Sequence, residues 1–561
     1  FFARRREAHR MKCARRLLIV CGVVLIWSAA ALTVHAQEKS SSANSGILAK
    51  IDESIAQVWE AHSVKPSDAA SDEEWCRRVF LDLLGRIPTF DELTSYVNDK
   101  SDSRKKTLVD SLIYSDKYTE EFARNWTSVW SNLLIGRTGG NDNNSMISRD
   151  GMQKYLRDSF ARGKPYDQFV RELITATGTT QPGSSEFNGA TNFLIDKVNA
   201  DNAAQATAAT SQIFLGLQVQ CTQCHNHPFN DWKQQKYWEM NAFFRQARAF
   251  RGRTDADSPI LADQDYSGES GNIEEADLFF ELRNGLLKVA YPVFVDGSEI
   301  PKSGYVNVVN RRDELSKRII GSPYFAKAIV NRVWAHFLGY GFTKPIDDLG
   351  PHNIASHPEL LEYLAEEFVK SGYDLRQLMT WVVMSRPYSL TSACNTSNQL
   401  DDPALGQQPK FSHFYLRQMS AEQLYESMLV LTGSAATDLS FEEQEARRNR
   451  WLRQFTTTFG TDDGGESTTF NGTIPQVLMM FNGEMTRTAT AGAGTLIEYA
   501  MAKNGTESVR FLFVSGLGRQ PTREESKVAQ ALLESRKGDR VEALKDLWWV
   551  ILNSNEFIFV H

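Results

Sequence analysis

The sequence predicts a mainly α protein made of two helical domains with a small β-hairpin or sheet element between them. Along most of the chain after residue 46, apolar residues recur at the three- and four-residue spacing of amphipathic helices. Valine, tyrosine and phenylalanine gather in one short region, residues 286–310, as is typical of strands. A length of 561 residues leaves room for two or more domains, each with its own core.

Residues 1–36 are predicted to be a secretory signal peptide with an upstream extension. Met11 is followed by three basic residues and an apolar run over residues 17–34, and Ala36 ends the segment. A basic start, an apolar core and small or aliphatic residues before the cleavage point define such a signal. The alternative is an uncleaved membrane anchor, because the run reaches the lower limit of spanning length, roughly 17–25 residues. We therefore expect a periplasmic or cell-surface protein that contacts the membrane only if this segment is retained.

The first helical domain is expected over residues 47–250, after a polar linker at residues 37–46. Thr89, with Glu92 three residues further on, has the pattern of a capped helix start. An alanine-rich helix is expected to lead directly into a cysteine motif. Helices are predicted at residues 47–58, 75–84, 108–113, 120–134, 152–160, 169–175 and 203–219.

A polar, glycine-rich linker over residues 251–285 is expected to precede the β element of residues 286–310. Lys288–Val295 and Tyr305–Val309 read as its two strands, with an Asp296-Gly297 turn after the first. The second helical domain then occupies residues 311–561. Its helices are predicted at residues 324–337, 358–370, 375–385, 421–431, 484–501, 509–517, 523–536 and 540–552.

Composition and charge exclude several classes of protein. The chain has 62 Lys+Arg and 69 Asp+Glu, a formal charge of -7. Without residues 1–36, which hold seven basic residues and one acid, the charge is -13, so we expect no nucleic-acid partner. Six cysteines are too few for a disulfide scaffold in a chain of this length. Neither a Walker-type phosphate loop nor a GxSxG elbow occurs.

The segment Cys221-Thr-Gln-Cys224-His225 is a C-x-x-C-H motif, the attachment sequence of c-type haem. Two thiols bond to the haem vinyl groups, and the adjacent histidine ligates the iron. Attachment takes place after export, which agrees with the predicted signal peptide. Candidates for a distal ligand are Met240, His336, His352 and His357, although a five-coordinate haem needs none.

Other chemistry remains open for the same cluster. Zinc or another metal is an alternative, with His225 and His227 as ligands together with Cys221 and Cys224. Four ligands within seven residues would strain a tetrahedral site, because zinc sites usually draw a second ligand pair from farther along the chain. The two cysteines alternatively form a redox-active or structural pair with no cofactor.

Polar and aromatic residues outside the motif offer further sites. Asp231 is either an acceptor that orients a ligating imidazole or a helix N-cap. Aromatic side chains at Trp126, Trp130, Trp232 and Trp238 are either sugar platforms or core. A polar cleft suited to acid–base chemistry on a glycan or ester is the other hypothesis, and a buried ion-pair network is its alternative. The residues of this cleft are Arg332, His336, Asp347 and His357.

The stretch from Cys221 through His-Pro-Phe-Asn-Asp-Trp to Phe244 resembles the signature of the planctomycete cytochrome-c-like domain. The stretch Arg78-Val-Phe-Leu-Asp-Leu-Leu-Gly-Arg-Ile-Pro-Thr89 resembles the same family. Residues 311–361, 475–483 and 552–557 are similar to the domain of unknown function that commonly follows in these chains. The resemblance covers nearly all of the exported chain. It implies a cytochrome-like role through the same C-x-x-C-H motif.

The sequence thus favours an exported c-type haem protein with an electron-transfer or redox role, served by a redox partner or by other exported proteins. A non-haem metal-binding or structural surface protein and an extracellular polysaccharide-binding or hydrolytic protein are the alternatives. The motif is predicted to lie between the two helical domains, beside a cavity wide enough for a porphyrin. A large cofactor needs apolar cover on both faces, and the aromatic run Trp232–Phe244 supplies one wall.

Overall fold

A computed structural model of the chain describes residues 44–140, 145–227, 232–251, 258–432, 496–536 and 539–561, with a few residues between 443 and 491. The predicted signal peptide, most of the predicted linker at residues 37–46, and Asp231 lie outside the described residues. The same holds for most of residues 435–495, including the start of the helix expected at residues 484–501.

The first half of the chain is helical, as predicted. Thr89 accepts a hydrogen bond from the Glu92 backbone and Glu92 returns one, which forms the expected capping box. A helix over residues 44–61 comes first. It is followed by α2 (Asp72–Leu84), α3 (Phe90–Asn98), α4 (Arg104–Tyr114), α5 (Thr119–Ile135), α6 (Arg149–Ala161), α7 (Tyr166–Thr175), α8 (Ile195–Asn199), α9 (Ala204–Leu215) and α10 (Gln234–Asn241).

The second half is helical as well. Ser322 caps the helix that begins with Pro323, where a proline costs no intrahelical hydrogen bond. A second reciprocal capping box joins Thr522 and Glu525. The helices are α11 (Arg311–Gly321), α12 (Pro323–Leu338), α13 (Pro358–Lys370), α14 (Leu375–Met384), α15 (Ala421–Thr432), α19 (Leu496–Met501), α20 (Gly505–Leu517), α21 (Arg523–Ser535), α22 (Arg540–Leu552) and α23 (Asn555–Ile558).

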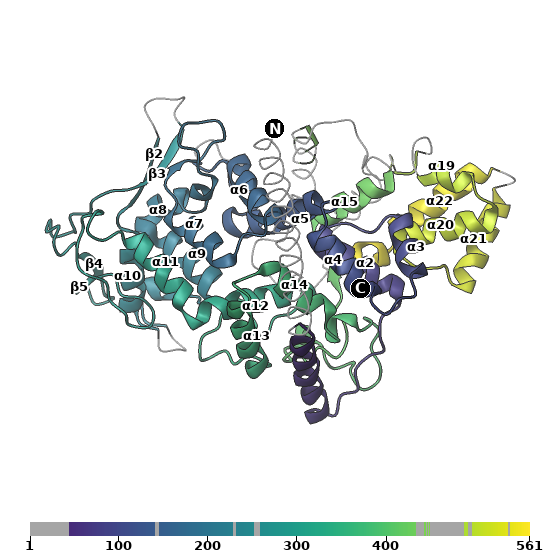
Figure 1. Cartoon of the computed structure of the whole chain (residues 1–561), viewed down its shortest axis with the longest axis horizontal. Coiled ribbons are helices and arrows are strands. Elements are labelled where there is room, and N and C mark those ends of the chain that lie inside the picture. Colours follow the sequence, from purple (N-terminus) through teal and green to yellow (C-terminus); the bar gives the residue numbers. More distant parts are fainter. Residues whose placement is uncertain are drawn as a thin grey trace, which may run out of the picture.

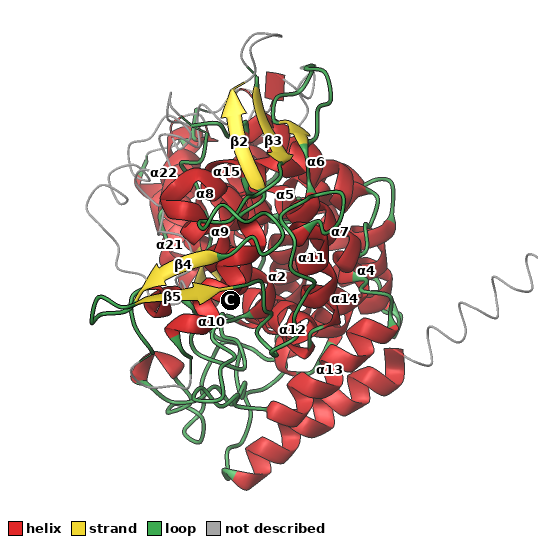
Figure 2. Cartoon of the chain, turned by 90° about the vertical axis from the view of Figure 1, so that its left-hand side faces the viewer, coloured by secondary structure: helices red, strands yellow, loops and turns green. Residues whose placement is uncertain are grey.

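Three small antiparallel sheets accompany the helices. The first has the order β1-β3-β2, the second is a hairpin of β4 and β5, and the third pairs β6 with β7. Figure 2 shows β2–β3 and β4–β5 against the helical body. The strands are β1 (Gly178–Thr179), β2 (Ala247–Arg251), β3 (Pro259–Asp263), β4 (Leu278–Glu281), β5 (Leu287–Ala290), β6 (Arg417–Gln418) and β7 (Phe559–Val560).

The strand partner predicted for the hairpin was wrong. Lys288 does lie in a strand, but it pairs with Phe280, inside the segment predicted to be a linker. Residues 305–309 form a turn in which the Val309 amide donates to the Tyr305 carbonyl at 3.0 Å. Burial explains the outcome, because the Phe280 ring stacks on Trp238 at 5.9 Å and this contact selects β4 as the partner.

The two halves share one hydrophobic core, which runs from Ile47 to Val560. The helix of residues 44–61 packs on the second half, where the Trp59 indole N–H donates to the Lys410 carbonyl at 2.8 Å. Helix α7 packs against α11, and α9 packs against α12. Helices α19–α22 lie at one end of the molecule beside α3, and β4, β5 and α10 lie at the other end (Figure 1). None of the helices in the described part of the chain is long and apolar enough to cross a membrane.

Candidate functional site

The cysteine motif lies in a short turn directly after α9. Gly216 ends that helix in the left-handed region (φ 62°), and a 3₁₀ helix, Gln220–Gln223, follows. The Thr222 hydroxyl donates to the Val219 carbonyl at 2.6 Å and closes the turn on itself. Helix α10 holds it from outside, because the Trp238 indole N–H and the Gln234 side-chain amide both donate to the Gln223 carbonyl at 3.1 Å.

Gln234 was not singled out from the sequence. Its buried amide also donates to the Glu281 carbonyl at 3.0 Å, so one side chain ties the motif, α10 and the β4–β5 hairpin together. The sequence does not indicate that a glutamine at the start of a helix joins three segments, because only the tertiary fold brings two backbone carbonyls to its side-chain amide.

Both cysteines of the motif are solvent-exposed and neither is part of a disulfide. A group attached to their sulfur atoms would lie against the protein surface and not inside an enclosed core cavity, unlike the pocket expected from the sequence. The exposure leaves both thiols accessible to chemistry from solvent.

His225 is half-buried, and its ring is oriented by a backbone group. Its Nδ1 lies 2.6 Å from the Asn226 carbonyl oxygen. A carbonyl only accepts hydrogen bonds, so Nδ1 carries the proton and the Nε2 lone pair is left for a metal. The Asn226 side chain in turn accepts the Gln234 backbone N–H at 3.0 Å, which fixes this residue to α10. Histidine ligands are commonly oriented in this way.

Residues that flank the motif contact the second half of the chain, as expected for a motif near the junction of the two halves. The Leu349 amide donates to the Gly216 carbonyl at 2.7 Å. Gln212 and Gln218 both donate to the buried Asp347 carboxylate. Beyond the motif, the His227 ring lies 5.9 Å from the His352 ring, centroid to centroid.

Replacing Gly216 by alanine is expected to lower the free energy of unfolding by about 2 kcal/mol. A Cβ there would lie 2.9 Å from the Leu349 Cδ1, on top of the strain of a left-handed backbone. Gly372 has φ +74° and nothing within 4 Å of its Cβ position, so Gly372→Ala measures the strain alone, about 1 kcal/mol. Urea denaturation followed by tryptophan fluorescence gives both values. Equal losses of unfolding free energy in the two variants would contradict tight packing of Leu349 against Gly216.

Of the four residues of the predicted polar cleft, the structure brings Arg332 and Asp347 close enough to interact, whereas the two histidines lie in separate aromatic surroundings. Arg332 is attracted electrostatically by Asp347, and burial lowers its pKa. His336 packs against Trp126 with ring centroids 4.9 Å apart. His357 contacts the Ser356 hydroxyl at 2.9 Å and faces aromatic rings of the second half. Burial lowers the pKa of each of these two histidines to about 4, so both are neutral near pH 7.

The remaining candidates also have defined places. Met240 is buried in the core, as are Trp126 and Trp130, which fits their interpretation as core residues. Trp232 and Trp238 are half-buried. The His352 Nε2 lies 2.8 Å from Asp348 Oδ2. Within the described ranges, no three His, Cys, Asp or Glu side chains gather as a set able to hold a metal ion.

Two protein families match this chain. The PSCyt2 family, described as a protein of unknown function (DUF1549), matches residues 50–249, which include the cysteine motif. The PSD1 family, described as a protein of unknown function (DUF1553), matches residues 311–533. No curated protein and no solved structure matches the chain. The chain therefore belongs to the planctomycete cytochrome-like family pair in which a PSCyt2 domain precedes a PSD1 domain, a pair of unknown function.

Proposed function

We propose that the protein is an exported c-type haem protein with an electron-transfer or redox role. The observation that carries the proposal is the state of the motif. Two unbridged, exposed thiols lie in one turn, and the adjacent His225 has its Nδ1 proton held by the Asn226 carbonyl. This donor set fits haem c, which requires two reactive thiols and one imidazole Nε2 lone pair.

In this proposal Cys221 and Cys224 would hold the group covalently, and His225 would bind its iron. Bound haem supplies a one-electron redox centre. The chain contributes orientation, because Trp238 and Gln234 fix the turn that carries the thiols. The Asn226 carbonyl accepts a hydrogen bond from Nδ1 and so keeps the histidine in one tautomer. This hydrogen bond also makes the Nε2 lone pair a stronger ligand for a metal.

The surface position of the motif supports electron exchange with another exported protein. A group on exposed thiols is within reach of a docked partner without any opening of the fold. Export through the predicted signal peptide would bring the chain to the compartment in which haem is attached to such motifs.

Expression in a host with a haem-attachment system tests the proposal. We expect about one covalent haem per chain, measured by the pyridine haemochrome spectrum and by peroxidase staining of a denaturing gel. Cys221→Ala and Cys224→Ala should each abolish stoichiometric loading. Cys394→Ala is the matched control, because Cys394 is also exposed and unbridged but lies outside the motif. It should load like the parent chain.

The ligand assignment has its own control. His225→Ala should alter the absorption spectrum of the bound haem or prevent covalent attachment of haem. His227→Gln should leave both the spectrum and the amount of attached haem unchanged. An absence of covalent haem, under conditions that load a known cytochrome, would overturn the proposal. So would stoichiometric zinc by elemental analysis without a Soret band, which would favour the metal-binding alternative.

A further inference from the structure

A cleft of about 450 Å³ lies between residues 65–69 and residues 386–390. Both segments are distant in sequence from the cysteine motif. The first segment belongs to the PSCyt2 match and the second to the PSD1 match. Backbone hydrogen bonds join them, from the Ala70 amide to the Ser389 carbonyl at 2.9 Å and from the Thr391 amide to the Asp68 carbonyl at 2.9 Å. The cleft therefore exists only where the two domains meet. Its volume is in the range of small-molecule sites, about 300–1,000 Å³.

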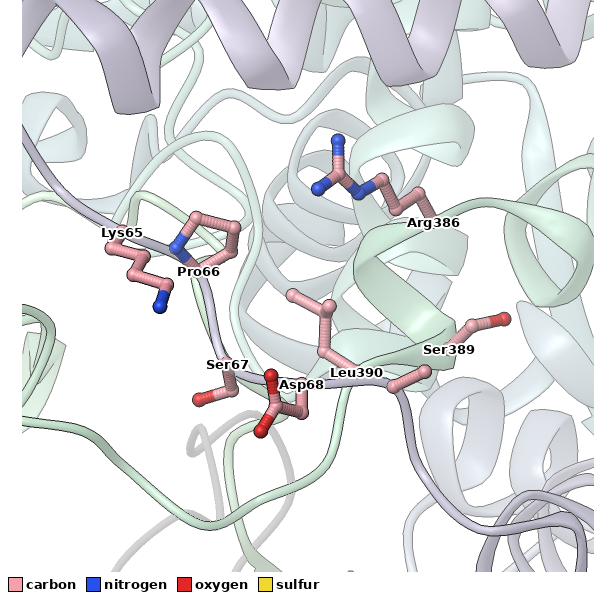
Figure 3. A pocket seen from close by; sticks show the side chains of 8 residues that line it. Lys65, Pro66, Ser67, Asp68, Arg386, Ser389 and Leu390 are labelled. Carbon is pink, nitrogen blue, oxygen red and sulfur yellow. The ribbon is translucent and has the colours of Figure 1, made fainter.

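Two exposed cations flank this cleft. Figure 3 shows Lys65 on one side and Arg386 on the other. Both side chains are exposed, and neither forms a salt bridge within the described part of the chain. Arg386 is nevertheless positioned, because its guanidinium lies over the Trp59 ring at 4.9 Å and its backbone N–H donates to Asp52 at 2.7 Å. The Asp52 carboxylate also attracts Arg386 electrostatically, so Arg386 offers a positioned planar donor and Lys65 offers the freer charge to an anionic group.

The other walls have different chemistry. The Leu390 side chain projects between Pro66 and Arg386, where it is largely buried, and the half-buried Pro66 ring is the more accessible apolar group (Figure 3). The hydroxyls of Ser67 and Ser389 are engaged elsewhere, with the Ala393 carbonyl and with Lys105. The exposed Asp68 carboxylate remains as an acceptor on the cleft wall.

We propose that this cleft binds a small hydroxylated organic anion of the sugar-acid class. A carboxylate on the ligand would pair with Lys65 and Arg386. Hydroxyl groups would donate to Asp68, which at the same time disfavours a second anionic group by charge repulsion. The C–H face of a sugar ring would pack on Pro66, above the largely buried Leu390. The proposal is independent of haem attachment. The residues that line the cleft are distant in sequence from the cysteine motif, and none of the hydrogen bonds described above joins them to it.

Isothermal titration of the full chain with D-galacturonate tests the proposal, with D-galactose, acetate and inorganic phosphate as the comparison ligands. We expect galacturonate to bind at least tenfold more tightly than each of the other three. Galactose lacks the anionic group, acetate lacks the hydroxylated ring, and phosphate lacks the apolar face. Equal binding of phosphate or acetate would overturn the sugar-acid assignment, and no binding of galacturonate would overturn the site.

Variants locate the binding. Lys65→Met and Arg386→Gln should each weaken galacturonate binding about tenfold, and Asp68→Asn should reduce the preference for galacturonate over phosphate. Arg283→Gln and Lys288→Met are matched controls, because both residues are exposed cations on or beside the β4–β5 hairpin. They should leave binding unchanged. Within the described residues the Lys65 side chain makes no hydrogen bond or ion pair, so Lys65→Met decides the question even if Arg386→Gln disturbs the helix of residues 44–61. Unchanged affinity in Lys65→Met would place the ligand elsewhere and overturn the proposal.

Discussion

Replacing Asp82 by alanine is expected to lower the free energy of unfolding by about 3–5 kcal/mol. Asp82 is fully buried in α2, and it accepts hydrogen bonds from the Arg417 guanidinium at 2.5 Å and from the Tyr388 hydroxyl at 2.7 Å. Removal of the carboxylate leaves a largely buried arginine without a counter-charge. Buried Arg78 lies close by, with its guanidinium 3.6 Å from the Phe414 ring centroid, so positive charge would accumulate.

Two control variants separate the charge from the hydrogen bond. Tyr388→Phe removes only a hydroxyl, so about 1–2 kcal/mol should be lost. Asp110→Asn breaks an exposed pair with Lys106 on α4 and should cost less than about 1 kcal/mol. Guanidinium denaturation followed by tryptophan fluorescence measures all three. If Asp82→Ala costs no more than Asp110→Asn, the buried pair does not stabilise the junction between the halves.

The Asp82 cluster also shows why the helices were predictable and their assembly was not. Helix α2 follows from apolar spacing and from a glycine at its end, both of which are local signals. The spacing gives no reason for an aspartate to be buried inside that helix. Its partners come more than 300 residues later, and only the tertiary fold brings Tyr388 and Arg417 to it. Local pattern therefore predicts elements, whereas burial of charge depends on contacts that sequence spacing does not encode.

The same division applies to the candidate site. The spacing Cys221–Cys224–His225 was visible because haem attachment demands these residues in immediate succession. A position between the halves was predicted from the need of a large cofactor for apolar cover on two sides, whereas both cysteines are exposed and only the residues flanking the motif contact the second half. The Arg332, His336, Asp347 and His357 hypothesis rested on residue types alone, and the structure gives the two histidines apolar neighbours instead. The hairpin partner failed for a related reason, since Phe280 is a strand residue by virtue of its contact with Trp238.

The buried histidines predict that the protein loses stability as the pH falls from about 6.5 towards 4. The pKa values of His336 and His357 are lowered to about 4 in the folded protein, mainly by burial, against a value near 6.5 in an unfolded chain. Between these values the unfolded chain binds more protons than the folded one. The free energy of unfolding therefore rises with pH through this window, and each histidine contributes about 3 kcal/mol that is present above pH 6.5 and lost near pH 4.

Urea denaturation at half-unit steps between pH 4.5 and 7.5 measures this dependence. His336→Gln removes one titrating group, so the slope of unfolding free energy against pH should fall by about 1.4 kcal/mol per pH unit between pH 5 and 6. The double variant with His357→Gln should lose about twice that slope, because the two rings have separate neighbours and titrate independently. The comparison is between slopes, so a constant loss of stability from the substitution itself does not affect it. Parallel curves for the parent chain and the two variants would show that folding does not lower the pKa of these imidazoles, contrary to their burial against aromatic rings.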